Sequence, residues 1–216
     1  MGNRAVITTR ENWKHCGVGV YLHWNGGRDS VEAFLKYCDL KGYRNPDQDC
    51  YGWARLCQVI GNFFGGSTSV GIDTIWHLDR DNGDNGVYII EGWNIVDRYY
   101  FDGQEQDVYD LNEMLLEIDK RMPEEEQIGK FLEAKEVMID ELAVGDEVVW
   151  IDWNGKVNIN TILGIGEKDK IVNGHNVEGV PYMDYYNRIE GNPANNCNNY
   201  LINKNFRLYK KVIENQ

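Results

Sequence analysis

The sequence predicts an α+β protein: a ββααββα layer domain over residues 1–122, followed by a small all-β, barrel-like module over residues 137–216. In the first part, apolar β-branched runs stand on both sides of two helical segments. In the second part, strand-like segments are separated by turn residues. Pro123 and the acidic run at 124–126 mark a change of composition, so residues 123–136 are expected to form a linker or a short helix.

Four strands are expected in the first domain. The β-branched and aromatic runs that end in turn residues are 3–9, 17–24, 87–90 and 95–101. The first two are expected to pair antiparallel across a polar loop at 10–16, and the last two to form a hairpin. Residues 67–72 are expected to be a polar, glycine-rich connection.

Three helices are expected in the same domain. Asp29 or Ser30 can cap the first helix, which ends at Gly42. The second begins near Asp49-Cys50 and ends at Gly65-Gly66, and the third covers about 110–121. Each has one apolar side, so we expect the helices to pack on the sheet.

The second module shows weaker but consistent strand signals. A turn at 141–146 leads into a strand that ends at Ile151, and Asn154-Gly155 predicts a hairpin to a partner strand at 159–165. Residues 200–212 alternate well enough for one more strand. The asparagine-rich stretch at 192–199 is expected to be a long loop.

The composition fits a folded protein that does not coat nucleic acid. Apolar residues make up 42% and aromatic residues 12% of the 216 residues, which suffices for a core. The formal net charge of −13 opposes phosphate binding over a broad surface. No apolar run reaches the about 18 residues of a membrane-spanning helix, and the N-terminus lacks a secretory segment.

Cysteine and histidine usage points to the cytoplasm. Five cysteines, an odd number without paired spacing, favour reduced thiols over a disulfide framework. The four histidines are scattered and form no zinc-like cluster with cysteine. We therefore expect no metal site and no cofactor.

The turn at 23–30 is a candidate anion site. Its glycines expose amide groups that can cradle a phosphate, Arg28 adds a charged fork, and Trp24 offers a face for a base. In the simpler interpretation, the glycines only make the turn and Asp29 only caps the helix. If this turn meets the glycine-rich loop at 65–69, one pocket results, lined by Trp24, Gly26, Gly27, Arg28, Trp53, Arg55, Ser67 and Thr68.

Cys50 is a candidate nucleophile, because a thiolate is favoured at the start of a helix. The run Asp49-Cys50-Tyr51-Gly52-Trp53 resembles the nucleophile segment of NlpC/P60-type cysteine peptidases, and residues 145–150 faintly resemble a following strand of that family. The family places its histidine at the start of a following strand, and no histidine occupies that place beside residues 145–157. The histidines downstream of Cys50 are His77 and His175, and neither has the expected context. A cysteine in the core is the simpler interpretation.

Three blocks of the chain together resemble a family of uncharacterised proteins from phages and integrative elements of gut Firmicutes. The blocks are 1–8 (MGNRAVIT), 21–30 (YLHWNGGRDS) and 49–55 (DCYGWAR). The resemblance covers about the first hundred residues and brings no known activity or catalytic residue. It implies a small accessory protein of a mobile element, a class that often opposes host defence.

Three functions are therefore expected, in this order. The first is a non-catalytic protein that counteracts bacterial defence by sequestering a small nucleotide-derived signal, although the acidic charge repels such a ligand. The second is an acidic inhibitor that binds a host defence protein through an aromatic surface. The third is a cysteine hydrolase acting through Cys50. Exposed tryptophan also makes a homo-oligomer conceivable.

Overall fold

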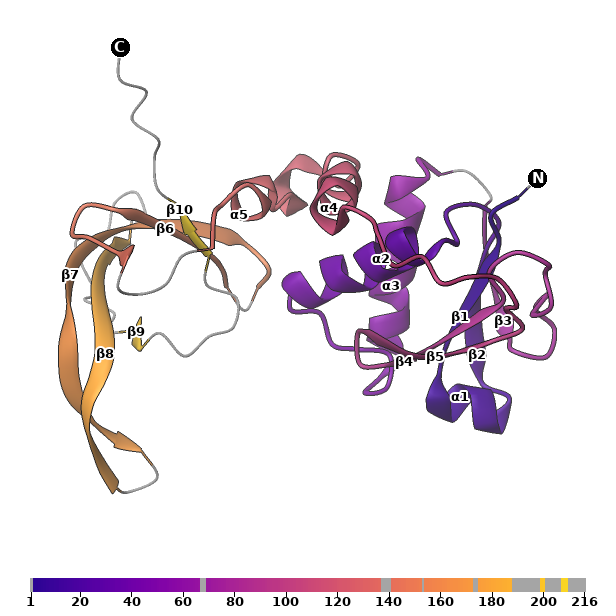
Figure 1. Ribbon diagram of the computed structural model, residues 1–216, viewed down its shortest axis with the longest axis horizontal. Coiled ribbons are helices and arrows are strands. Elements are labelled where there is room, and N and C mark those ends of the chain that lie inside the picture. Colours follow the sequence, from indigo (N-terminus) through magenta and orange to yellow (C-terminus); the bar gives the residue numbers. More distant parts are fainter. Residues whose placement is uncertain are drawn as a thin grey trace, which may run out of the picture. The chain divides into compact units, whose positions relative to one another are not determined.

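The computed structural model describes residues 2–66, 69–136, 141–152, 154–172, 175–187, 199–200 and 207–209. The chain divides into two compact units, Met1–Gly129 and Lys130–Gln216, and this division falls within the predicted linker at 123–136. Helices and strands are combined in the first unit, and a separate sheet forms in the second (Figure 1). The predicted α+β class is thus confirmed.

The first unit is built on a five-stranded mixed sheet with the strand order β3-β2-β1-β4-β5. Its strands are β1 Ala5–Thr9, β2 Val18–Leu22, β3 Val70–Thr74, β4 Val87–Glu91 and β5 Asn94–Tyr99. Strand β1 pairs antiparallel with β2 and parallel with β4, and the remaining pairs are antiparallel. The four predicted strands are confirmed.

Strand β3 corrects the prediction of a polar connection at 67–72. Gly71 and Asp73 disfavour a strand locally, and the side chains of this strand are half-buried or exposed. Pairing with β2 along the whole of β3 stabilises the strand instead. The local sequence carries no sign of that long-range pairing.

The described residues of the first unit form five helices, and side chains cap two of the three predicted ones. They are α1 Arg10–His15, α2 Arg28–Leu40, α3 Cys50–Phe63, α4 Leu111–Asp119 and the 3-10 helix η1 Glu124–Glu126, and α5 Gly129–Leu132 follows at the division between the units. The side chain of Asp49 caps α3, and that of Asp110 caps α4. The three predicted helices are confirmed.

Two local predictions about helices were wrong. The N-cap of α2 is Gly27, which has no side chain to cap the helix, rather than Asp29 or Ser30. Residues 10–15 form α1 instead of a loop: Thr9 accepts a hydrogen bond from the Asn12 amide, and Cys16 ends the helix in the left-handed conformation. Helix α1 is too short to show an apolar period.

The two faces of the sheet are covered differently. Helix α2 contacts β5 and helix α3 contacts β3, and both helices lie along one face (Figure 1). On the other face, the buried residues Val6, Ile75, Val87 and Ile89 form a cluster against which Trp13 of α1 packs. Only a short helix and a loop therefore cover this second face.

A buried polar network ties α2 to the segment after α4. Asp119, which is 3% exposed, accepts hydrogen bonds from the Tyr37 hydroxyl at 2.6 Å and from the Ile128 amide at 2.7 Å. The Lys41 ammonium donates to the Glu126 carbonyl at 2.8 Å and pairs with its carboxylate at 2.9 Å. Glu126 is therefore an anchor of the first unit. Residues 123–136 were predicted to be a linker or a short helix, and η1 and α5 lie within them.

The second unit contains a sheet with the strand order β10-β6-β7-β8-β9. Its strands are β6 Glu147–Ile151, β7 Val157–Val172, β8 His175–Asn187, β9 Asn199–Tyr200 and β10 Arg207–Tyr209. Strands β9 and β10 stand at opposite edges, so the described strands form an open sheet and not the predicted barrel-like closure. The predicted hairpin partner at 159–165 lies within the longer β7.

Most of the predicted loop at 192–199 and much of the predicted strand at 200–212 lie outside the described residues. Within those stretches the structure describes only the short strands β9 and β10.

We predict that Asp119→Ala lowers the free energy of unfolding by about 2–4 kcal/mol, because two buried donors lose their acceptor. Urea denaturation monitored by tryptophan fluorescence measures this change. Glu117→Ala, an exposed change on the same helix, should stay within about 0.5 kcal/mol of the wild type. Equal effects of the two substitutions would contradict the role of the buried network.

Candidate functional site

Gly26 lies in the turn before α2, and the structure shows why glycine is needed there. A side chain at this position would come within 2.7 Å of Ala5 and of the backbone of Arg4. The Gly26 amide donates to the Asn3 carbonyl at 2.8 Å, and the Gly26 carbonyl accepts from the Tyr88 hydroxyl at 3.1 Å. The amide predicted to hold a phosphate is therefore bound within the protein.

The first turn of α2 also finds its partners within the chain. Gly27 is buried at the N-cap, and the amide of Asp29 donates to Oε1 of Gln106 at 3.3 Å. Gln106 thus takes the position that an anion would occupy at this helix start. The glycines make the turn, as the simpler interpretation of the sequence expected, but Asp29 does not cap the helix.

Arg28 is held by two carboxylates of the first unit. Its guanidinium lies 3.4 Å from Glu105 and 3.5 Å from Glu32. Glu105 also pairs with Arg98 at 2.5 Å, and the Tyr109 hydroxyl donates to Glu32. An incoming anion would have to displace these carboxylates, so the charge of Arg28 is largely balanced before any ligand arrives.

A small polar pocket adjoins Arg28. Its volume is about 120 Å³, and it is lined by Arg28, Glu32, Lys36, Trp93, Asn94 and Ile95. Pockets for drug-sized ligands measure about 300–1,000 Å³, so this pocket is too small to enclose a nucleotide. Lys36 is also paired with Asp39 at 2.9 Å.

Trp53 and Arg55 lie in the first part of α3, at the end of the sheet where β4 turns into β5. The Arg55 guanidinium stands 5.2 Å from the centroid of the Tyr43 ring. The Tyr43 carbonyl accepts a hydrogen bond from the indole of Trp93, which lies in that turn, at 3.0 Å. Trp93 also lines the small pocket beside Arg28, and the predicted pocket that would join Trp53 and Arg55 to the turn at 23–30 stays a prediction.

Trp24 follows β2 at the other end of the sheet and is 44% exposed. The ring of His23 lies edge-on against it, with centroids 4.9 Å apart. The His23 amide donates to the Ser69 carbonyl at 2.9 Å, so the turn at 23–30 and the end of the loop at 65–69 do adjoin. Ser67 and Thr68 of the predicted pocket lie outside the described residues.

Cys50 opens α3 and is exposed, which fits one requirement of the hydrolase hypothesis. Within the part of the chain that the structure describes, no hydrogen bond joins its thiol to a histidine. The histidines of the first unit contact other groups, and they are His15, His23 and His77. A general base for Cys50 is therefore not supplied by these residues.

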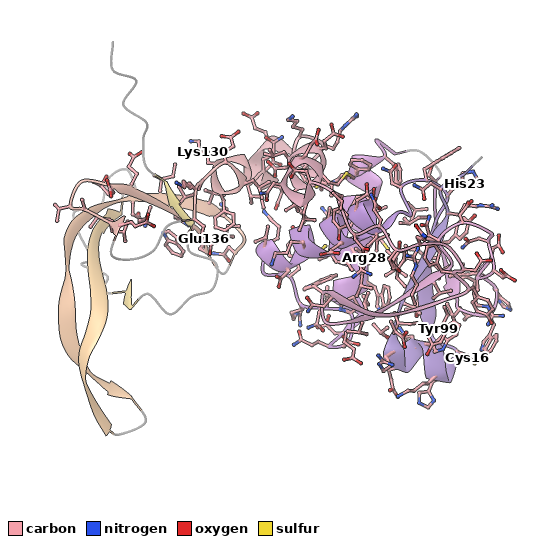
Figure 2. All side chains as sticks on the ribbon, in the orientation of Figure 1. Cys16, His23, Arg28, Tyr99, Lys130 and Glu136 are labelled. Atoms are coloured by element: carbon pink, nitrogen blue, oxygen red, sulfur yellow. The ribbon has the colours of Figure 1, made fainter. Side chains whose placement is uncertain are left out.

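A group of aromatic side chains, several of them exposed, was not predicted as a site. We call it the aromatic surface, and it consists of Trp13, Trp76, Arg80, Tyr99 and Tyr100. It lies beside α1, since Tyr99 stacks on Trp13 of that helix, and Figure 2 labels Tyr99. These residues come from three separate segments, α1, the loop after β3 and the end of β5, so only the fold brings them together.

The aromatic surface is ordered by ring stacking and by one arginine. The rings of Trp13 and Tyr99 stack at 4.9 Å with an interplanar angle of 8°. The Arg80 guanidinium lies 4.2 Å from the Trp76 ring centroid and 5.7 Å from that of Tyr100. Trp76 nevertheless remains 55% exposed and Tyr100 48% exposed, and the Trp76 indole donates to the Cys16 thiol.

Carboxylates flank the aromatic surface. The side chains of Asp73, Asp79 and Asp97 are 50%, 56% and 40% exposed, and Asp79 and Asp97 lie 4.0 Å from Arg4 and 3.6 Å from Arg10. A hydrogen bond from the Thr74 amide, supported by the ring of His77, holds the pKa of Asp73 below its ordinary value. This carboxylate is therefore charged at neutral pH, and the surface combines aromatic rings with negative charge.

Comparisons of the chain with protein-family models, with curated proteins and with solved structures gave no match. None of the helices that the structure describes has the length and apolar character needed to cross a bilayer. Within the same residues, no three histidine, cysteine or acidic side chains are grouped as metal ligands.

We predict that Gly26→Ala lowers the free energy of unfolding by about 2 kcal/mol or more, because the new methyl group would overlap the backbone before β1. Thermal denaturation measures the effect. Gly61→Ala in α3 is the matched control: no atom lies within 4 Å of its methyl position, and alanine favours the helix by up to about 1 kcal/mol. A harmless Gly26→Ala would reopen the phosphate hypothesis.

We predict that iodoacetamide at neutral pH modifies Cys50 well before Cys38. Burial raises the pKa of the Cys38 thiol, so this thiol stays protonated and is shielded from solvent, whereas Cys50 is exposed. Peptide mapping by mass spectrometry gives the order of modification. Equal modification of both thiols in the folded protein would show that the core around α2 opens readily.

Proposed function

We propose that this chain acts by binding another protein, and that the aromatic surface of the first unit is the contact region. The observation that carries the proposal is the exposure of Trp76 and Tyr100 around Arg80. Tryptophan, tyrosine and arginine are the residues most enriched among energetic hot spots of protein interfaces. The flanking carboxylates favour a partner with a basic surface.

The shape and charge of this region support a protein partner over a nucleotide. Trp13 and Tyr99 already stack on each other, so their facing sides are not available to a base. The Asp73 carboxylate would repel phosphate groups, and the net charge of −13 adds to that repulsion. The same charges accelerate association with a basic protein.

The resemblance of the first hundred or so residues to proteins of phages and integrative elements supports a partner from the host's defence. In this proposal the chain acts in the bacterial cytoplasm as an acidic inhibitor that covers a basic surface of a defence protein. Sequestration of a nucleotide-derived signal, the first function expected from the sequence, has weaker support, because Arg28 is already paired and the pocket beside it is too small to enclose a nucleotide.

We predict that Trp76→Ala lowers recovery of a host protein in affinity capture by about tenfold or more, since a truncated hot-spot residue costs about 2 kcal/mol or more. Quantitative mass spectrometry after capture from the host lysate measures the change. Trp24→Ala is the matched control, because Trp24 is also exposed and lies outside the aromatic surface. Equal recovery with both variants would contradict the proposal.

A further inference from the structure

Strand β3 forms one edge of the first sheet, and its hydrogen bonds show which of its residues face outward. The His23 amide donates to the Ser69 carbonyl at 2.9 Å, and the Ile75 amide donates to the Gly17 carbonyl at 2.8 Å. In an antiparallel pair, hydrogen-bonded positions alternate with positions that bond away from the partner strand. Odd-numbered residues of β3 therefore bond to β2, and even-numbered residues point their backbone groups to the free edge.

The outward backbone groups of β3 are not all equivalent. The Thr74 amide donates to the Asp73 carboxylate at 2.6 Å, and the Thr74 carbonyl accepts from the His77 amide at 2.9 Å. Val70 and Ile72 have no such local partner among the described residues of the first unit. The edge thus presents two amides and two carbonyls in the spacing of an unpaired strand.

The side chains of β3 leave this edge open. Ile72 is 60% exposed, and the strand contains no proline, lysine or bulge of the kind that protects edge strands. Gly71 has no side chain to obstruct a neighbouring backbone. Trp76 follows the strand by two residues, so the free edge leads directly into the aromatic surface.

We propose that the free edge of β3 binds an extended, basic segment of a partner protein, which adds to the sheet as a further strand. This inference rests on the proposed function, because the same partner protein would contact the aromatic surface and pair with the adjoining edge of β3. Backbone hydrogen bonds to Val70 and Ile72 hold the segment. Its side chains alternate: apolar ones lie beside Ile72, and lysine or arginine lies on the face of Asp73.

Charge distinguishes this occupant from a second copy of the chain. Each copy carries a net charge of −13, so pairing of two β3 edges brings like charges together. A basic segment instead neutralises Asp73, a charged and half-exposed carboxylate whose neighbour at 3.3 Å is His77.

Nuclear magnetic resonance of the full chain with synthetic peptides tests the proposal. The probe is a short peptide of alternating lysine and valine, and the control is the same peptide with glutamate in place of lysine. We expect the lysine peptide, at about millimolar concentration, to shift the Val70 and Ile72 amide signals and to slow their hydrogen exchange. Unchanged amide signals with the lysine peptide, or equal binding of the glutamate peptide, would overturn the proposal.

Two substitutions at one position separate backbone from side-chain contributions. Ile72→Pro removes an outward amide that takes no part in pairing with β2, and edge strands tolerate proline at such positions. Ile72→Pro should weaken the affinity for the lysine peptide about tenfold or more. Ile72→Thr keeps the amide and a β-branched side chain, so it should weaken that affinity only a few-fold. Equal losses in both variants would overturn the strand-addition mode.

The peptide-binding and capture experiments can show separately whether strand addition or the aromatic surface is wrong. If Ile72→Pro leaves peptide binding intact while Trp76→Ala still abolishes capture of the host protein, strand addition is wrong and the aromatic surface remains the contact region. If the lysine peptide binds at Val70 and Ile72 while Trp76→Ala leaves capture unchanged, strand addition stands and the contact region has been misassigned.

Discussion

Burial of the central strand β1 is the constraint on which the rest of the first unit depends. All its residues are buried, so both faces of the sheet need cover. The antiparallel neighbour β2 follows after the short α1, but the parallel neighbour β4 requires a long crossover connection. That crossover supplies α2 and α3 for one face, and α1 with the loop after β3 covers the other.

The unequal cover of the two faces explains where binding chemistry is available. On the face of α2 and α3, the polar groups of the turn before α2 already have partners within the chain: Arg28 pairs with glutamates, Gly26 bonds to Asn3, and Asp29 bonds to Gln106. On the other face, a six-residue helix and a loop cannot cover the aromatic side chains fully. Exposed rings therefore remain where the cover is thinnest, and such rings gain most from a protein partner.

Local signals made most of the fold predictable, and long-range contacts account for the differences. The apolar periods of α2, α3 and α4 and the Asp49 and Asp110 caps are visible in single segments, as is the β4–β5 hairpin. Strand β3 exists only through pairing with β2, and Gly26 is required only because β1 passes close to it. The Arg28 partner Glu105 is 77 positions away, so its neutralisation could not be derived from the turn sequence.

The free edge of β3 and the acidic charge of the chain are physically connected. An unprotected edge strand can pair with any extended chain, including a second copy of the same protein, unless another force favours one partner. Here the net charge of −13 favours a partner of opposite charge, since it repels copies of the chain and attracts a basic segment. Salt screens both effects over about 8 Å at physiological ionic strength, so added salt weakens binding of a basic partner while it relieves repulsion between copies. Self-association and partner binding at this edge must therefore respond to salt in opposite directions.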